Sequence, residues 1–318
     1  MSSTMSISSL MSISSFRVRR AAVVLAGLVL FCAAAAPQQP VPPPASGADR
    51  AALEILEKAK AGDANSEIAV GDALKAAKNY AEAIKWYQKA AEQGSARGQF
   101  SLGVIYAQGQ GVPRDYAEAA RWYRKAADQG DAKAQYNLGL LCDSGQGVAQ
   151  DFAKAAEWYG KSAEQGFPDA QYNLGVAYAA GQGVSLNYDR AASWFRKAAE
   201  QDDAEAQYQL GLLYGLGHGV EKNYDQAVSW YRKAAEQGFA QAQIALALMY
   251  GLGHGVKADP AEAYFWITVG LAGDITDRSA AERTRAALAV QLSPDQLAKL
   301  QQRCRQWAAE HPQAAPPQ

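Results

Sequence analysis

Six tryptophans recur at a constant spacing of 36 residues, and this period constrains the fold more than any other feature of the chain. They are Trp86, Trp122, Trp158, Trp194, Trp230 and Trp266. Leu-Gly pairs recur on the same period, and their glycines are Gly103, Gly139, Gly175 and Gly211. A fixed period of about 20–50 residues is typical of stacked repeats, because one unit cannot bury its apolar face alone. We therefore predict that these tryptophans and glycines are structural residues of a repeat array.

Each unit is predicted to form two helices joined by a glycine loop. In residues 130–166, Ala134, Leu138 and Leu141 share one face of a first helix. The run Gly145-Gln-Gly147 then ends that helix, because glycine accepts the positive φ found after helix ends. A second helix follows a capping Asn or Asp, at Asn79, Asp115, Asp151, Asn187, Asn223 and Asp259. A Glu three residues later suggests a variant of the capping box at Glu82, Glu118 and Glu262.

These units resemble Sel1-like repeats, which are relatives of tetratricopeptide repeats with a longer inner loop. The resemblance is carried by A-x-A-Q-x-x-L-G in the first helix, by the Gly-x-Gly loop, and by W-Y-x-K-A-A-x-Q-G in the second helix. It covers about residues 62–273, although the first unit lacks the loop and looks like an ordinary tetratricopeptide unit. The predicted fold is all-α: a right-handed α-solenoid of about six helix-turn-helix repeats with N- and C-terminal capping helices.

The flanking segments predict an exported protein. Residues 1–36 place Arg17, Arg19 and Arg20 before a short apolar run and an alanine-rich stretch, as in a secretory signal peptide. Cys32 would allow a lipid anchor, but Phe31 stands where a lipoprotein signal has a small residue. The periplasm of a Gram-negative cell is the expected compartment, ahead of a lipid-anchored or secreted form, with no membrane span after cleavage.

The remaining segments complete the predicted domain organisation. Residues 37–48 form a proline-rich, disordered linker, and residues 49–61 form the N-terminal capping helix. Residues 274–311 form two C-terminal capping helices, the last of which begins with Ser293 as N-cap, Pro294 at the first helical position and Gln296 at the third. Residues 312–318 are a disordered tail.

Composition and motifs predict a protein without catalytic chemistry. The formal charge is −1, and removing the three arginines of residues 1–36 leaves −4, so no basic stripe favours nucleic acid. The chain lacks His-Glu-x-x-His, Gly-x-Ser-x-Gly and Cys-x-x-Cys motifs. Cys142 occupies a tyrosine position of the other repeats and is predicted to pack in the core. His218 and His254 share one loop position and are expected to be exposed loop residues rather than metal ligands. We expect neither a metal nor a cofactor.

The surface of the array is therefore the expected functional element. On the first helices, the positions not needed for packing form one column of Ser101, Asn137, Asn173 and Gln209, and an adjacent one containing Arg97 and Lys133. The resemblance to related arrays implies that an Asn or Gln column holds an extended peptide by its backbone amides, here through Asn137, Asn173 and Gln209. The aromatic column of Phe100, Tyr136, Tyr172 and Tyr208 is expected in the core.

These observations predict a non-catalytic scaffold or adaptor of the cell envelope that binds a protein or peptide segment in the concave groove of the array. It would regulate a signalling complex or an envelope-assembly complex. The alternative, a hydrolase acting on cell-wall material or β-lactams, follows only from the resemblance to secreted Sel1-like proteins. The partner and the oligomeric state stay open.

Overall fold

The computed structural model describes residues 47–311, and all the secondary structure in this part of the chain is α-helical. The all-α prediction is confirmed. The predicted signal peptide, most of the predicted linker and the predicted tail lie outside the described residues. The first described helix is α2 (Gly47–Lys60), where the sequence predicted a capping helix at residues 49–61.

Twelve of the helices form six consecutive pairs that follow the predicted period. The first helices of the pairs are α3 (Ala64–Ala76), α5 (Ala96–Gln108), α7 (Ala132–Ser144), α9 (Pro168–Ala180), α11 (Ala204–Leu216) and α13 (Ala240–Leu252). The second helices are α4 (Tyr80–Glu92), α6 (Tyr116–Asp128), α8 (Phe152–Glu164), α10 (Tyr188–Ala199), α12 (Tyr224–Glu236) and α14 (Pro260–Gly270). The chain continues with α15 (Arg278–Ala289) and α16 (Pro294–Glu310).

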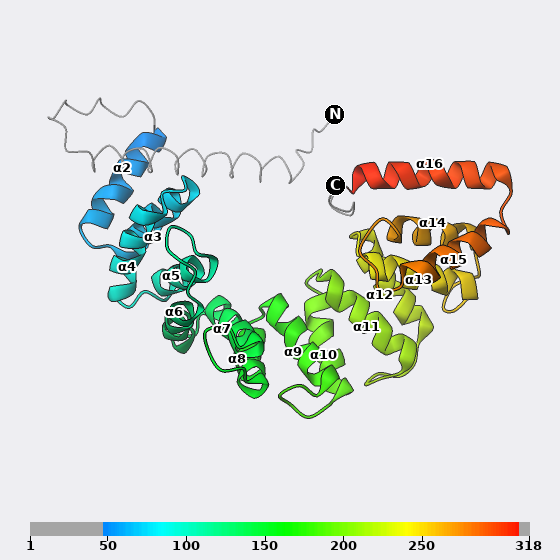
Figure 1. The fold of residues 1–318 in the computed structure, drawn as a ribbon, viewed down its shortest axis with the longest axis horizontal. Coiled ribbons are helices and arrows are strands. Elements are labelled where there is room, and N and C mark those ends of the chain that lie inside the picture. The colour runs from blue at the N-terminus through cyan, green and yellow to red at the C-terminus, as the bar shows by residue number, and fades with distance from the viewer. Residues whose placement is uncertain (1–46, 312–318) are drawn as a thin grey trace, which may run out of the picture. The chain divides into compact units, whose positions relative to one another are not determined.

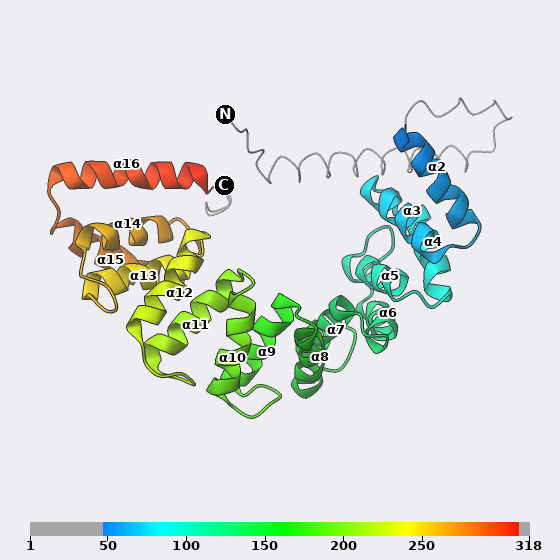
Figure 2. The same cartoon turned by 180° about the vertical axis from the view of Figure 1, so that it is seen from behind.

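The chain divides into two compact units between Asp151 and Phe152. In unit 1, consecutive helices pack on one another from α2 to α7 (Figure 1). In unit 2, they pack in the same way from α8 to α14, and α15 and α16 both pack on α14 (Figure 2). This consecutive packing of helix pairs is the arrangement of an α-solenoid. The repeat period runs through the boundary, so the single array of residues 62–273 stays a prediction.

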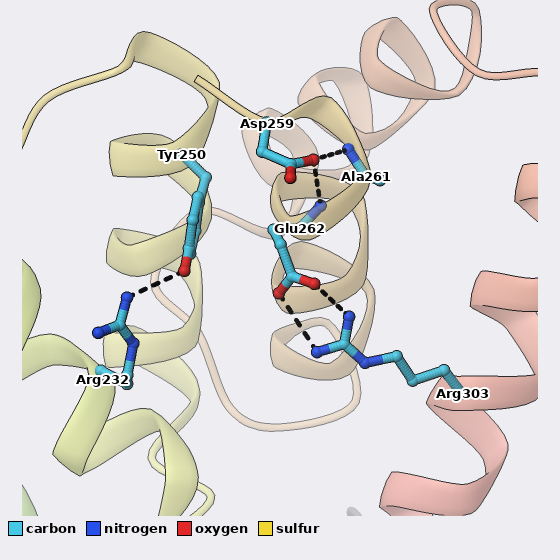
Figure 3. Close-up of polar contacts among 6 residues, drawn as sticks. All are labelled: Arg232, Tyr250, Asp259, Ala261, Glu262 and Arg303. Atoms are coloured by element: carbon cyan, nitrogen blue, oxygen red, sulfur yellow. Dashed lines mark hydrogen bonds and ion pairs between the residues drawn. The ribbon is translucent and has the colours of Figure 1, made fainter. Parts of the chain in front are cut away.

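The second helices begin at the predicted N-caps, but the predicted capping box is wrong. The side chain of Asp259 accepts hydrogen bonds from the backbone N–H groups of Ala261 and Glu262 (Figure 3). The backbone N–H of Asp259 already donates to the carbonyl of Tyr250, at 3.0 Å, so it does not need the Glu262 carboxylate. Glu262 pairs instead with Arg303 and ties α16 to α14.

The corresponding glutamates of unit 1 also form ion pairs in place of the capping-box hydrogen bond: Glu82 pairs with Lys85, and Glu118 pairs with Arg121. The other N-caps whose side chains accept a bond from the first turn are Asn79, Asp115, Asn187 and Asn223. A complete capping box is present at the start of α16, between Ser293 and Gln296, as predicted.

The two glycines of each loop have different tasks. The first one ends the first helix in the left-handed conformation, with φ of 67° at Gly181, for example. The second one, Gly183, has φ of 71°, and a Cβ there would lie 2.1 Å from the carbonyl oxygen of Phe152. The loop therefore rests directly on the start of the preceding second helix, α8. Second helices end at left-handed glycines too, and Asp202 adopts the same conformation with φ of 65°.

Two adjacent aromatic residues of a second helix can differ in burial and in the neighbours that they contact. Phe195 is only 1% exposed and lies inside its own helix pair, because a Cβ on Gly175 would be 2.7 Å from its ring. Trp230 is half-buried and packs against the apolar cluster of α10 and α11, with Lys233 stacked 4.0 Å from its ring centroid. Trp158 and Trp266 are buried, whereas Trp86, Trp122 and Trp194 are half-buried.

A row of buried glutamines links consecutive helices, a role that was not predicted from the sequence. Its members are Gln99, Gln135, Gln171, Gln207 and Gln243, the glutamines of the A-x-A-Q motif. Gln207 Nε2 donates to the carbonyl oxygen of Ala199 at 3.1 Å, and Gln207 Oε1 accepts from Gln237 Nε2 at 2.9 Å. One side chain thus joins the end of α10, the interior of α11 and the end of α12.

The first helix pair has Glu67 in place of this glutamine. The Glu67 side chain is 2% exposed and accepts a hydrogen bond from Gln93 Nε2 at 2.8 Å. Burial raises the pKa of the Glu67 carboxyl, and nearby Lys89 partly offsets this effect. A buried carboxylate therefore occupies a position at which five later units have a neutral amide.

Replacing Gln207 with Met should destabilise the protein by about 1–3 kcal/mol, because the Ala199 carbonyl would lose a buried partner and Gln237 would lose an acceptor. Urea denaturation followed by circular dichroism measures this change. Gln226→Met is the matched control, since Gln226 is an exposed residue of α12. Equal stability of the two variants would contradict a stabilising role for the glutamine row.

Candidate interaction surface

The predicted partner-binding residues of unit 1 are partly engaged with their own surroundings. Arg97 is exposed but pairs with Asp72 at 2.7 Å. Asn137 Nδ2 donates to the backbone carbonyl of Lys133 at 2.8 Å, so one amide proton is already used within α7. Lys133 is exposed and Ser101 is half-buried. Their role in binding stays a prediction.

In unit 2, Asn173 and Gln209 are both half-buried. Tyr172 lies beside them, with its ring centroid 5.8 Å from that of Phe195 in the core. Its hydroxyl interacts with Gln209 and Glu205, and burial together with the Glu205 charge raises the pKa of Tyr172 to about 12. Tyr172 therefore packs against the core of its helix pair but is only half-buried, and its hydroxyl reaches the polar surface of α11. Binding by Asn173 and Gln209 also stays a prediction.

The most exposed apolar side chains of the first helices lie on α11 and α13. Leu216 is 60% exposed, and Leu248 and Leu252 are 44% and 65% exposed. Residues four apart share one side of a helix, so Leu212 and Leu216 form a ridge on α11, and Leu248 and Leu252 form the equivalent ridge on α13. We call these four residues the leucine ridges. They were not predicted from the sequence, although Leu216 and Leu252 occupy the same position one period apart.

A cavity of about 260 Å³ adjoins the leucine ridges. Its walls come from α11, α13, α14, α15 and the segment before α15, and they include Tyr208, Ile244, Leu248, Ile275 and Asp277. The cavity exists because α15 follows α14 at the place where another first helix would begin. Repeat periodicity could not predict it, because α15 lies beyond the last repeat.

Charge on the first helices of unit 2 has one sign. Helices α9, α11 and α13 carry Asp169 and Glu205 and contain no Lys or Arg. Asp203, the N-cap of α11, adds a further acid, and its pKa is raised by burial and by the nearby Asp169. The basic residues of the repeats in unit 2 belong to α8, α10 and α12 and to the loops at Lys222 and Lys257. Two of them still reach the first helices: Arg196 donates to the Tyr214 hydroxyl of α11, and Arg232 donates to the Tyr250 hydroxyl of α13 (Figure 3).

The residues considered for chemistry lie outside this surface. His218 and His254 are exposed, and their rings stack on Tyr188 and Tyr224 with centroids 4.7 and 4.6 Å apart. Cys142 is 3% exposed, in keeping with its predicted packing position. Within residues 47–311, no group of three or more His, Cys, Asp or Glu side chains is placed to hold a metal ion.

Comparison with known proteins agrees with this architecture. The Sel1 repeat profile matches residues 70–95, 96–131, 132–167, 168–203, 204–239 and 240–268. The chain belongs to the Sel1 repeat family. No curated protein sequence matches it. Sel1 repeat proteins generally serve as protein-interaction scaffolds and are typically non-catalytic.

Two solved structures are similar over most of the repeats. One is a protective antigen present in uropathogenic Escherichia coli strains, with 33% identity and a TM-score of 0.71 over 82% of this chain. The present chain spans 56% of that antigen. The other is a Sel1 repeat protein from Oxalobacter formigenes, with 36% identity and a TM-score of 0.64, covering 66% of this chain and 87% of that one. Among the described helices, none has the length and apolar character needed to cross a membrane.

Proposed function

We propose that this Sel1 repeat protein is a non-catalytic adaptor of the cell envelope that binds a partner segment on the first helices of unit 2. The observation that carries the proposal is the pair of leucine ridges beside the 260 Å³ cavity. An exposed apolar patch next to a concave site is typical of interaction surfaces, because soluble proteins seldom leave such surface uncovered without a use.

The proposed location in the envelope rests on residues 1–36, whose arginines and apolar run have the order of a secretory signal. Amino-terminal sequencing of the protein recovered from a periplasmic fraction tests it. A mature N-terminus among residues 35–37 supports export, and an intact N-terminus on protein confined to the cytoplasm would contradict it.

A variant carrying Leu248→Glu and Leu252→Glu should lose the partner while keeping the fold. Both side chains are substantially exposed, so the substitutions cost little in folding but place charge in an apolar contact. Affinity purification from an envelope extract, with quantitative mass spectrometry, should show at least a ~10-fold loss of one specific partner, the effect of about 1.4 kcal/mol.

Val290→Glu is the matched control, because Val290 is 87% exposed and lies at the end of α15 outside the leucine ridges. Circular dichroism should give the same helical signal for the wild type and both variants. If the double variant retains every partner at wild-type abundance, the leucine ridges are not the binding surface.

A further inference from the structure

The surface around the leucine ridges also indicates what kind of segment it binds. We propose that the partner segment combines at least one Lys or Arg with a large apolar side chain, the first facing Asp169 and Glu205 and the second entering the cavity. This inference rests on the proposed function and specifies its partner.

The cavity favours an apolar side chain in the partner segment. Its volume of about 260 Å³ is bounded by Tyr208, Ile244, Leu248 and Ile275, and Leu248 is 44% exposed at its border. Burying one Leu, Ile or Phe side chain of a partner there would remove apolar surface from water on both molecules. A site of this kind anchors a bound segment through a single side chain.

The distribution of charge favours a basic residue in the partner segment. Glu205 and part of the cavity wall belong to the same helix, α11. The Tyr172 hydroxyl interacts with Glu205 of α11, and the same helix carries the cavity residue Tyr208. Neither α9 nor α11 nor α13 supplies a Lys or Arg to neutralise Asp169 and Glu205. Burial is the main cause of the raised pKa values at Asp203 and Tyr172, and the nearby charges of Asp169 and Glu205 add to it. Such a surface attracts basic segments and repels acidic ones.

Arg278 and Arg283 of α15 keep their positive charges, and their hydrogen bonds go to neutral groups of α15 and of the segment before it. Arg278 donates to the backbone carbonyls of Leu271 and Gly273, and Arg283 donates to Ser279. Arg285 is close enough to Cys304 of α16 to influence its pKa, which places it toward the α16 side of the helix. The acidic residue at the border of the cavity is Asp277, whose side chain caps α15 by accepting from the Ala280 N–H.

The probe is a phage-displayed library of random dodecapeptides selected against the purified protein, followed by affinity measurement on synthetic copies of the enriched peptides. We expect enriched peptides with a net positive charge and at least one Leu, Ile, Phe or Met. Their affinity should fall about 10-fold for the Asp169→Asn/Glu205→Gln variant, since each exposed ion pair contributes a few-fold. It should also weaken as salt rises.

Glu236→Gln is the matched control, because Glu236 is exposed at the end of α12, a second helix. Neutral or acidic enriched peptides, no enrichment, or affinity unchanged in the Asp169/Glu205 variant would each overturn the inference. So would a concentration-dependent dimer that the Leu248→Glu/Leu252→Glu variant abolishes, because the surface would then bind a second copy of this chain. If partner capture still depends on the leucine ridges, only the proposed partner chemistry fails; if it does not, the proposed function fails as well.

Discussion

Phe195→Ala should destabilise the protein by about 3–5 kcal/mol, the range for removing a buried aromatic ring from a core. Phe195 is 1% exposed, and its ring occupies the space that Gly175 leaves open between the two helices of the pair. Residue 175 has no side chain that could fill the resulting cavity, and the neighbouring Tyr172 ring would lose its packing partner. Chemical denaturation monitored by circular dichroism measures the change.

Trp194→Ala is the matched comparison for Phe195→Ala. Trp194 is the adjacent residue on α10 and belongs to the 36-residue tryptophan column, but it is only half-buried. Its loss should cost about 1–2 kcal/mol, because part of the ring already faces water. A larger effect at Trp194 than at Phe195 would contradict the packing described here.

Gly183→Ala should destabilise the protein by about 3 kcal/mol or more, since it combines a left-handed backbone with a steric clash. The added Cβ would lie 2.1 Å from the carbonyl oxygen of Phe152, which belongs to the first turn of α8 and cannot rotate away. The loop would have to leave the preceding repeat. Thermal denaturation should therefore show a clear decrease in the midpoint temperature.

Gly166→Ala separates the effect of the left-handed backbone from the effect of the steric clash. Gly166 has φ of 87°, but a Cβ there would meet nothing within 4 Å. Its replacement should cost only about 1–2 kcal/mol, the conformational penalty of a left-handed alanine. If Gly166→Ala and Gly183→Ala are equally destabilising, contact between the loop and the preceding helix contributes nothing to stability.

Local sequence signals were sufficient to predict the helix pairs of this protein. Helix starts at residues such as Asn187 and helix ends at residues such as Gly181 depend on interactions within a few residues, so the sequence alone reveals them. The different burial of Trp194 and Phe195 could not be predicted, because both are large aromatic residues. Only the position of Gly175 on the other helix of the pair distinguishes them.

The candidate surface was harder to predict because it depends on contacts between distant segments. Asn173 and Gln209 could be selected because they occupy the same position in successive first helices. The cavity requires α15, which has no counterpart among the repeats. The role of Gln207 was also hidden, since a glutamine in an amphipathic helix is normally assigned to the surface. Its periodic recurrence beside small residues was the signal that could have identified it.

Hydrogen–deuterium exchange with the captured partner shows directly whether the partner binds on the first helices of unit 2. We expect slower exchange of the backbone amides in α11, α13 and the start of α15 when the partner is bound, with no change in α10 and α12. Protection confined to the second helices, or no protection in unit 2, would contradict the assignment of the first-helix surface as the binding site.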